Sequence, residues 1–284
     1  MTTIAITGAT GQLGRLAIAA LKTRAPHANL IALVRDPAKA RDLDLPTRVF
    51  DYTKAADLAV GLAGVDVLIL ISSSDFNDRA GQHRNVIAAA KAAGVGRVIY
   101  TSILHGAASP LLLAADHITT EAALRDSGVP CTILRNGWYT ENYTGALGGA
   151  LAHGALIGAA GTGPISSAAR ADYAEAIAVV ASSTGHDNAV YELAGDTAHT
   201  MADLAAEISR QTGTTLPYTD LLQDSYADIL QGFGLPAAFA AILADADAQA
   251  AKGALFDDSR TLSGLIGRPT TPIAVTVAAA LATL

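Results

Sequence analysis

The chain has little positive charge and almost no cysteine. Its 284 residues include 19 Lys and Arg against 26 Asp and Glu, which gives a formal net charge of −7 at pH 7. Because nucleic-acid binding needs a basic face, this balance argues against a nucleic-acid partner. The one cysteine, Cys131, excludes an intrachain disulfide, as is typical of proteins from reducing compartments, and its apolar strand pattern predicts a buried thiol.

Long apolar runs and metal-binding motifs are also missing. No run of about 18 apolar residues occurs, so no membrane span is expected. No basic-then-apolar leader precedes the first apolar segment, and we therefore expect a cytoplasmic protein. Neither a His-Glu-x-x-His sequence nor a cysteine pair occurs, so no metal site is predicted. The sequence also contains no Gly-x-Ser-x-Gly elbow, so a serine hydrolase of the α/β-hydrolase type is not expected.

What the chain does have is a glycine-rich turn between an apolar strand (3–7) and a helix. Gly8 permits a tight turn, Gly11 lets the backbone approach a pyrophosphate, and Gly14 lets the helix pack closely against the strand. The helix N-terminus offers N–H groups to an anion. The helix is expected to present one apolar face at Leu13, Leu16, Ala17, Ala20 and Leu21. The predicted dinucleotide-binding loop is Gly8, Ala9, Thr10, Gly11, Gln12, Leu13 and Gly14.

Strands and helices alternate over the first half of the chain, and the strands are almost continuously apolar. This pattern predicts an α/β fold with a doubly wound parallel sheet covered on both faces, with ligands at the carboxyl ends of the strands. After the first helix, strands are expected at 29–34, 48–50, 65–71, 97–101 and 131–135, and helices at 55–62, 79–93 and 115–126.

The alternation loosens beyond residue 140. We expect residues 1–140 to form the NADP-binding Rossmann domain. Residues 141–284 are expected to form a smaller, mainly helical substrate or lid lobe with segments that return to the sheet. In this half, helices are predicted at 172–182, 201–212, 225–233 and 235–251, and a strand at 189–193.

The residues that follow the second strand predict the cofactor. Sites for NAD place an acidic residue here for the ribose hydroxyls, but the first residue past the strand is Arg35. A guanidinium at this point pairs with a 2′-phosphate, and Lys39 adds charge from the next turn. Asp36 takes the acidic role if the strand ends one residue later. We favour NADPH, with NADH bound more weakly. Asp51, after the third strand, is either an adenine contact or a helix N-cap.

Several stretches together resemble one family, the NmrA-like branch of the atypical short-chain dehydrogenases, and within it the bacterial type 2 NAD(P)H:quinone oxidoreductases. The resemblance covers nearly the whole chain. Its narrowest motif is the Asn-Gly-Trp-Tyr run that is followed by Glu141 and Asn142. The matching segments are 8–14, 70–74, 82–94, 134–142, 157–161, 170–173, 191–196 and 252–259.

This resemblance implies a flavin-free enzyme that passes a hydride from NADPH directly to a quinone. It also implies an alternative, because some NmrA-like proteins bind a dinucleotide without turnover and regulate a partner as redox sensors. A third reading is a reductase of another activated carbonyl. Monomers and small homo-oligomers both occur in the family, and no membrane partner is implied.

The acid–base pair of ordinary short-chain dehydrogenases is absent. Those enzymes use a Tyr with a Lys four residues later. By the spacing to Glu121, Leu113 takes the Tyr place and His117 the Lys place, although Ser102 fits the usual serine position. Alcohol oxidation by the usual mechanism is therefore not expected. His117 either hydrogen-bonds the nicotinamide ribose or relays a proton, or it is a satisfied structural histidine.

A quinone needs positioning and hydrogen-bond donors near the developing oxyanion more than it needs an acid. Asn136, Tyr139 and Asn142 on the loop after the sixth strand are the candidates. The alternatives are lid packing for Trp138 and Tyr139 and a helix N-cap for Asn142. Phe76, with Tyr139, is a candidate wall for a planar quinone, and the alternative for Phe76 is an aromatic residue that anchors its own loop. The remaining expected cofactor contacts are Ser72, Ser73, Ser74, Gly137, Trp138, Tyr139, Thr140, Glu141 and Asn142.

Overall fold

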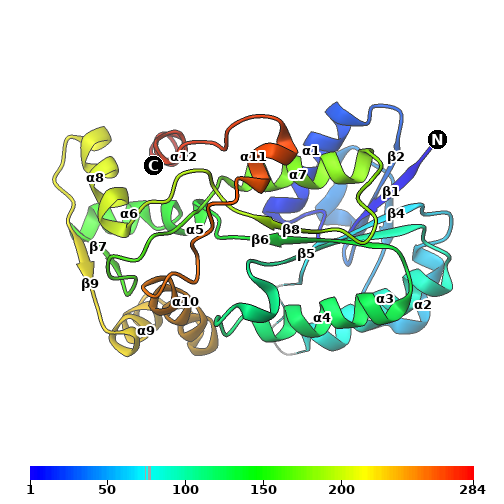
Figure 1. The fold of residues 1–284 in the computed structure, drawn as a ribbon, viewed down its shortest axis with the longest axis horizontal. Helices are drawn as coiled ribbons and strands as arrows, with labels where there is room; N and C mark the ends of the chain where they lie inside the picture. The colour runs from blue at the N-terminus through cyan, green and yellow to red at the C-terminus, as the bar shows by residue number, and fades with distance from the viewer. Residues whose placement is uncertain (74, 76–77) are drawn as a thin grey trace. The chain divides into compact units, whose positions relative to one another are not determined.

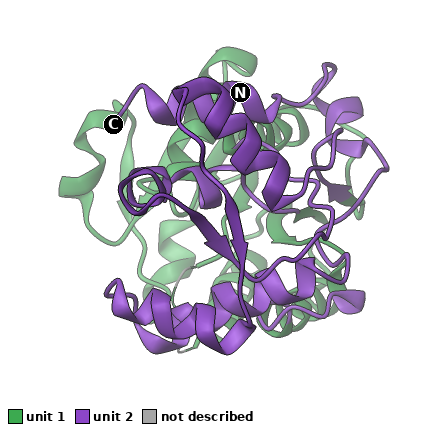
Figure 2. Cartoon of the chain, turned by 90° about the vertical axis from the view of Figure 1, so that its left-hand side faces the viewer, with its two compact units in different colours: residues 1–106, 115–136, 170–191 green, residues 107–114, 137–169, 192–284 purple. Residues whose placement is uncertain are grey.

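The computed structural model describes residues 1–73, 75 and 78–284, and these divide into two compact units (Figure 1, Figure 2). Unit 1 comprises residues 1–106, 115–136 and 170–191. Unit 2 comprises residues 107–114, 137–169 and 192–284. Residues 170–191 thus belong to the unit that holds the N-terminal half of the chain. A division of roles between residues 1–140 and 141–284 stays a prediction.

A seven-stranded sheet has the order β3-β2-β1-β4-β5-β6-β8. All the pairs from β3 to β6 are parallel, which confirms the predicted doubly wound fold. The strand order reverses between β1 and β4, and such a switch point is where ligands bind in open parallel sheets. The strands are β1 (Thr3–Ile6), β2 (Asn29–Val34), β3 (Thr47–Val49), β4 (Val67–Leu70), β5 (Arg97–Ile103), β6 (Cys131–Asn136) and β8 (Val190–Leu193).

Helices cover both faces of this sheet within unit 1. Helices α1 (Gln12–Arg24) and α7 (Arg170–Ser182) lie on one face, and α2 (Ala55–Gly61), α3 (Arg79–Ala92) and α4 (Ala114–Ser127) lie on the other (Figure 1). Two 3₁₀ helices connect elements, η1 (Pro37–Leu43) and η2 (Gly106–Ala108). Because β1 and β4 pair in parallel, their carboxyl ends lie at the same edge of the sheet.

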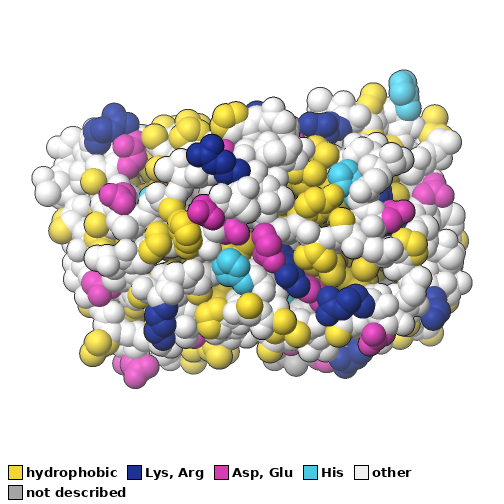
Figure 3. Space-filling model, in the orientation of Figure 1, with side chains coloured by type: hydrophobic (Ala, Val, Ile, Leu, Met, Phe, Trp, Pro, Cys, Tyr) yellow, Lys and Arg dark blue, Asp and Glu magenta, His cyan; other side chains and the backbone are white. Residues whose placement is uncertain are grey.

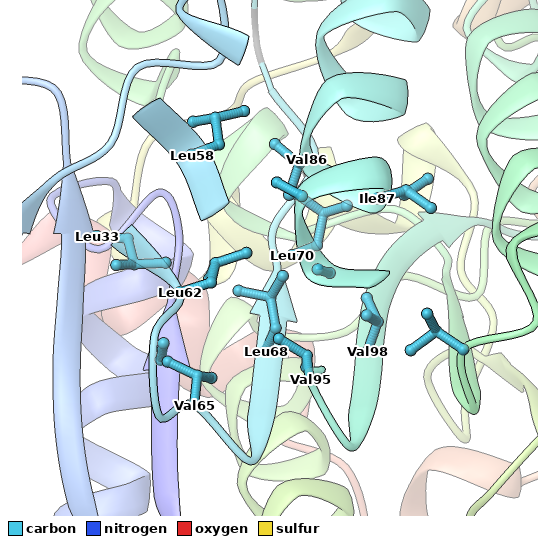
Figure 4. Close-up of a cluster of buried hydrophobic side chains, with 14 of the residues drawn as sticks. Leu33, Leu58, Leu62, Val65, Leu68, Leu70, Val86, Ile87, Val95 and Val98 are labelled. Atoms are coloured by element: carbon cyan, nitrogen blue, oxygen red, sulfur yellow. The ribbon is translucent and has the colours of Figure 1, made fainter. Parts of the chain in front are cut away.

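One part of the core of unit 1 lies between the sheet and helices α2 and α3. All four residues of β4 are buried, because a parallel strand covered on both faces has no solvent side. Side chains of α3 pack against the residues of β4 (Figure 4). The labelled members of the cluster are Leu33, Leu58, Leu62, Val65, Leu68, Leu70, Val86, Ile87, Val95 and Val98.

The expected apolar face of α1 is confirmed at Leu13, Ala17 and Leu21 and was wrong at Leu16 and Ala20. Leu16 is 38% exposed, and Ala20 is only partly buried. The buried residues of the helix are Leu13, Gly14, Ala17, Ile18 and Leu21. The physical reason is Gly14, which must face the strand–helix turn, so the helix is rotated to bury residues 14 and 18 in place of residues 16 and 20.

Unit 2 contains more elements than the pattern predicted. Its helices at Met201–Thr212 (α8), Gln223–Gly232 (α9) and Ala237–Ala250 (α10) correspond to predicted segments. A small parallel sheet pairs β7 (Leu156–Gly158) with β9 (Tyr218–Asp220), and neither strand was predicted. The further unpredicted helices are α5 (Glu141–Thr144), α6 (Leu147–His153), α11 (Thr261–Ile266) and α12 (Ile273–Leu281).

The surface carries mixed charge. On the face drawn in Figure 3, acidic and basic side chains are interspersed with apolar ones. Among the described residues, no helix combines the length and apolar character that crossing a membrane requires.

Candidate cofactor and substrate site

The glycine turn between β1 and α1 has the three distinct glycine roles that a dinucleotide loop needs. Gly8 has a positive φ of 60°, which L side chains rarely adopt. A Cβ at Gly14 would lie 2.2 Å from the Gly8 carbonyl oxygen, so only glycine fits there. Gly11 donates its N–H to the same oxygen at 2.9 Å, and its exposed Cα leaves the backbone open to a ligand. The structure therefore has the loop geometry that the sequence predicted.

The N-terminus of α1 is suited to an anion. Its N-cap residue is Gly11, and no side chain caps the first N–H groups of this helix. The first turn carries no acidic residue, and the basic side chain next in line, Arg15, is paired with Asp42. Uncapped N–H groups together with the helix dipole favour a phosphate at this position. The residues present thus fit a dinucleotide pyrophosphate.

The end of β2 presents a cation. Arg35 is exposed, and among the described residues no hydrogen bond or ion pair occupies its guanidinium. The carboxylate of Asp36 accepts the N–H of Ala38 at 2.9 Å and caps η1. Hydrogen bonds from Thr53 and, more weakly, the positive charges of Lys54 and Arg35 lower the pKa of Asp51. Asp51 thus caps a turn and is not the N-cap of α2, which is Lys54.

The loop that follows β4 lies directly beside the glycine turn. A Cβ at Gly8 would approach the Cβ of Ile71 to 3.3 Å. Ser72 and Ser73 are half-buried, and the Ser73 hydroxyl accepts the N–H of Asp75 at 3.0 Å. Ser74 and Phe76 lie outside the described residues. The two loops that the sequence assigned to the cofactor are therefore neighbours at the switch point of the sheet.

His117 is buried in α4. Its Nδ1 is 2.7 Å from the hydroxyl of Tyr100 on β5. Burial, aided by the positive charge of Arg79, lowers the pKa of His117 to about 3, so the ring is neutral at physiological pH. This environment favours the structural alternative for His117 over a proton relay.

Ser102 is bound to a buried carboxylate. Its hydroxyl donates to Glu121 at 2.6 Å, and Arg135 donates to the two oxygens of the same carboxylate at 2.9 and 2.7 Å. Burial disfavours the charged form of Glu121, but the bonds from Arg135 and Ser102 outweigh it and lower its pKa. Removing one partner of this pair would leave an uncompensated buried charge, which is strongly destabilising. The cluster therefore holds β5, β6 and α4 together.

The loop after β6 lies in unit 2 and is pinned to a neighbouring segment. Gly137 donates to the Leu193 carbonyl at 2.7 Å, and Thr140 donates to the Ala168 carbonyl at 2.9 Å. Trp138 accepts the N–H of Ala168 through its carbonyl. The hydroxyls of Thr140 and Ser167 are 2.9 Å apart. The loop backbone is thus held by residues 167–168, which fixes its side chains in alternation.

That alternation separates two kinds of side chain in the loop. Trp138 and Thr140 are buried, Tyr139 and Glu141 are half-buried, and Asn142 is exposed. Glu141 begins α5, so Asn142 lies inside this short helix and is not its N-cap, which is Thr140. Tyr139 and Asn142 therefore remain the accessible candidates for substrate contact, and lid packing describes Trp138 better.

Within unit 1, the structure brings together the glycine turn, Arg35 and the loop after β4, and within unit 2 it forms one pinned loop from residues 137–142. The side chains that sequence reasoning missed are the buried acceptors that hold the loops, Thr7, His83 and Thr101. Their signal was present, since each is a polar residue at a core position of an otherwise apolar pattern. No group of three or more potential metal ligands occurs among the described residues.

Comparison with known proteins agrees with this geometry. A family model described as NAD(P)H-binding matches residues 8–184. The chain belongs to this NAD(P)H-binding family. It is 54% identical over 277 residues to quinone oxidoreductase 2 of Escherichia coli K12, which covers 96% of this chain and 97% of that protein. The resemblance to the NmrA-like quinone oxidoreductases is thereby confirmed.

Solved structures extend the comparison. The E. coli NADPH-dependent quinone oxidoreductase complexed with NADPH matches with a TM-score of 0.95 at 53% identity and covers 98% of this chain and 99% of its own. The negative transcriptional regulator NmrA in complex with NADP matches with a TM-score of 0.77 at only 16% identity, over 97% of this chain and 94% of its own. The second likeness shows a shared fold alone.

Proposed function

We propose that this protein is an NADPH-dependent quinone reductase that works by direct hydride transfer without a flavin. The observation that carries the proposal is the 54% identity to a quinone oxidoreductase over almost the entire length of both chains. The cofactor loops of unit 1 support it independently, because they fit a dinucleotide without reference to any relative. NADPH, when bound, supplies the hydride.

The cofactor is held by residues of the two neighbouring loops and the end of β2. The N–H groups at the start of α1 and the backbone at Gly11 receive the pyrophosphate. Arg35 pairs with the 2′-phosphate, which makes NADPH the preferred form and NADH the weaker one. Ser72 and Ser73 contribute further contacts to the cofactor.

Tyr139 and Asn142 position the substrate. Hydride addition to a quinone leaves negative charge on its oxygen, and a phenol or amide N–H that donates to this oxygen stabilises the transition state more than the ground state. The product is a stabilised hydroquinone anion, which water can protonate. The burial of His117 and the replacement of the usual Tyr by Leu113 therefore do not prevent this reaction. The ring of Tyr139 provides a flat apolar wall for the quinone.

The rival function is a dinucleotide-binding regulator that lacks turnover. The regulator NmrA shares only the fold with this chain, whereas the quinone oxidoreductase shares more than half of the aligned residues. This contrast supports the enzyme. We also propose that the protein works in the cytoplasm as a monomer or a small homo-oligomer; its one cysteine is buried and free, as expected in a reducing compartment.

A turnover assay tests the function. Protein shown to contain no flavin is mixed with NADPH and a simple benzoquinone, and NADPH absorbance is followed against a control without protein. Sustained loss of absorbance over many equivalents is expected. NADPH binding in calorimetry without any turnover across a series of quinones would establish the regulator instead.

A second experiment tests the roles of the substrate residues. Tyr139→Phe and Asn142→Ala should each lower kcat/KM for quinone by about tenfold to a hundredfold, because each removes a hydrogen bond made in the transition state. The Kd for NADPH should stay close to that of the parent. Tyr191→Phe removes a phenol that bonds His186 at 2.8 Å and serves as the matched control with unchanged kinetics. Parent-like kcat/KM in both test variants would assign these residues a packing role.

A further inference from the structure

The loop after β4 has an unusual set of hydrogen-bond partners. Three successive backbone N–H groups are each accepted by a side chain from a different element of unit 1. Ile71 donates to the Thr7 hydroxyl at the end of β1 (3.0 Å), and Ser72 donates to the Thr101 hydroxyl on β5 (2.9 Å). Ser73 donates to Nε2 of His83 on α3 at 3.1 Å. The path of this loop is therefore set by side chains and not by a strand partner.

The protons around His83 have one consistent assignment. The Thr120 hydroxyl donates its only proton to the Asp116 carbonyl at 2.8 Å. Its oxygen, 3.0 Å from Nδ1 of His83, must then accept a proton from that nitrogen. Nε2 is left with a lone pair, which receives the Ser73 N–H. A chain of three hydrogen bonds thus runs from the loop through His83 to α4.

His83 is held rigidly as well as hydrogen-bonded. Its side chain has no exposed surface, and its ring lies edge-on to Tyr52 and Tyr100, with centroid separations of 6.3 and 5.5 Å. Burial, aided by the charge of Arg79, lowers the pKa of His83 to about 3. The ring therefore stays neutral, as its role as an acceptor requires.

We propose that His83 is a positioning residue that fixes Ile71, Ser72 and Ser73, at the start of the loop after β4, in the conformation that receives NADPH. The location of the loop supports this role, because it lies at the switch point of the sheet with Ile71 against Gly8 of the glycine turn. His83 itself touches neither cofactor nor substrate in this role. The proposal rests on the proposed function only in taking NADPH as the ligand.

The arrangement also gives a use to α4. In ordinary short-chain dehydrogenases this helix carries the Tyr and Lys of the acid–base pair, which are absent here. In this chain, Thr120 and the Asp116 carbonyl of α4 orient His83 instead. The helix thus acts on the cofactor loop through a hydrogen-bond chain and not on the substrate through a proton.

Two substitutions at His83 separate hydrogen bonding from packing. His83→Leu introduces an apolar side chain of similar size and leaves the Ser73 N–H without its acceptor. His83→Gln places an amide oxygen where Nε2 lies and restores an acceptor. We expect His83→Leu to raise the Kd for NADPH about tenfold and the KM for NADPH in parallel, with kcat at saturating NADPH within about twofold of the parent. His83→Gln should recover most of this loss.

A matched pair of substitutions at Thr120, the next residue along the hydrogen-bond chain, serves as the second test. Thr120→Val removes the acceptor for the Nδ1 proton, and Thr120→Ser keeps it. Only the Val variant should weaken NADPH binding, by several-fold. This pair carries the test if His83→Leu does not fold, which thermal unfolding reports.

Binding is measured by calorimetry without quinone, so the result does not depend on turnover. A parent-like Kd in both His83→Leu and Thr120→Val would overturn the proposal, as would equal losses in the Leu and Gln variants. A parent protein that binds NADPH but reduces no quinone would refute the proposed function and leave the role of His83 intact.

Discussion

Two neighbouring side chains of opposite charge follow β2, and their surroundings differ. The Asp36 carboxylate is engaged by its own turn, where it accepts the N–H of Ala38, whereas Arg35 is exposed. From the sequence, either residue was a candidate for contact with the adenosine ribose, because a shift of one residue in the strand end exchanges their directions. The structure places the end of β2 at Val34 and so favours Arg35 as the contact.

The residue-scale prediction concerns Arg35→Ala. A charge-assisted, bidentate pair with the 2′-phosphate contributes roughly 1.5–3 kcal/mol, so the variant should bind NADPH about tenfold to a hundredfold more weakly. NADH carries only a hydroxyl at this position, and its Kd should change little. Calorimetry with both cofactors measures the contrast. Arg84→Ala removes an exposed cation from α3 and is the control. An unchanged Kd for NADPH would show that Arg35 is merely a solvated residue, and equal losses for NADPH and NADH would show that it does not read the 2′-phosphate.

At the scale of elements, the strand–turn–helix at residues 3–24 allows the fold and the ligand site to be tested separately. A methyl group at Gly14 would meet the Gly8 carbonyl at 2.2 Å, whereas one at Gly11 would meet the same oxygen at 3.2 Å. Gly14→Ala must therefore separate α1 from the turn, while Gly11→Ala needs only a small adjustment. The two substitutions add the same methyl group with different structural consequences.

We expect Gly14→Ala to lower the free energy of unfolding by about 2–4 kcal/mol, as overpacking against backbone does. Gly11→Ala should fold with nearly the parent stability but bind NADPH and NADH at least tenfold more weakly, because the methyl group occupies the approach of the pyrophosphate. Urea unfolding and calorimetry measure the two effects. If Gly11→Ala binds both cofactors like the parent, the turn is not the pyrophosphate site.

The strands and the long helices of unit 1 were predictable because burial on both faces forces near-continuous apolar runs. The short elements of unit 2 were not, since β7 and β9 have three residues each and contain no periodic pattern of their own. These two strands exist because they pair with each other across a long stretch of sequence. Similarly, the face of α1 depends on the contact of Gly14 with the turn, which periodicity does not encode.

The candidate site was predictable to the extent that it consists of backbone turns and charges at strand ends. Gly8, Gly11, Gly14 and Arg35 fall into this class. The contacts of His83 with Ser73 and of Glu121 with Arg135 join elements that are distant in the chain, and no local rule selects these partners. A polar side chain in an apolar pattern signals that a partner exists, but only the fold identifies it.

For the whole molecule, the response of stability to pH depends on carboxylates that folding desolvates. Asp247 on α10 is 4% exposed, and its Oδ2 accepts the N–H of Ala159 at 3.0 Å. Burial raises its pKa from 3.8 to about 6, with a smaller upward effect from Asp220 and an opposing one from the Ala159 N–H. Burial raises the pKa of Tyr143, Tyr218 and Tyr226, and the charge of Asp247 raises each of them further. For Tyr218, a hydrogen bond to Asp220 adds to this effect.

The last prediction follows from the sign of this shift. A carboxyl with a pKa that folding raises favours the folded state when protonated, and this contribution is lost as the pH rises from about 4 through 6. At neutral pH, ionised Asp247 therefore destabilises the fold by roughly 2–3 kcal/mol. Asp247→Asn keeps an oxygen for the Ala159 N–H and removes the charge, so it should raise the free energy of unfolding in urea by about 2 kcal/mol at neutral pH. The gain should fall to about half by pH 5, because the parent carboxyl is then largely protonated in the folded state.

Asp245→Asn is the control on the same helix and should give no gain. The Asp245 carboxylate accepts hydrogen bonds from the Leu112 N–H at 2.8 Å and the Gln249 amide at 3.3 Å. A stability difference for Asp247→Asn that does not change with pH would mean that Asp247 is ionised throughout and that packing, not charge, governs its effect.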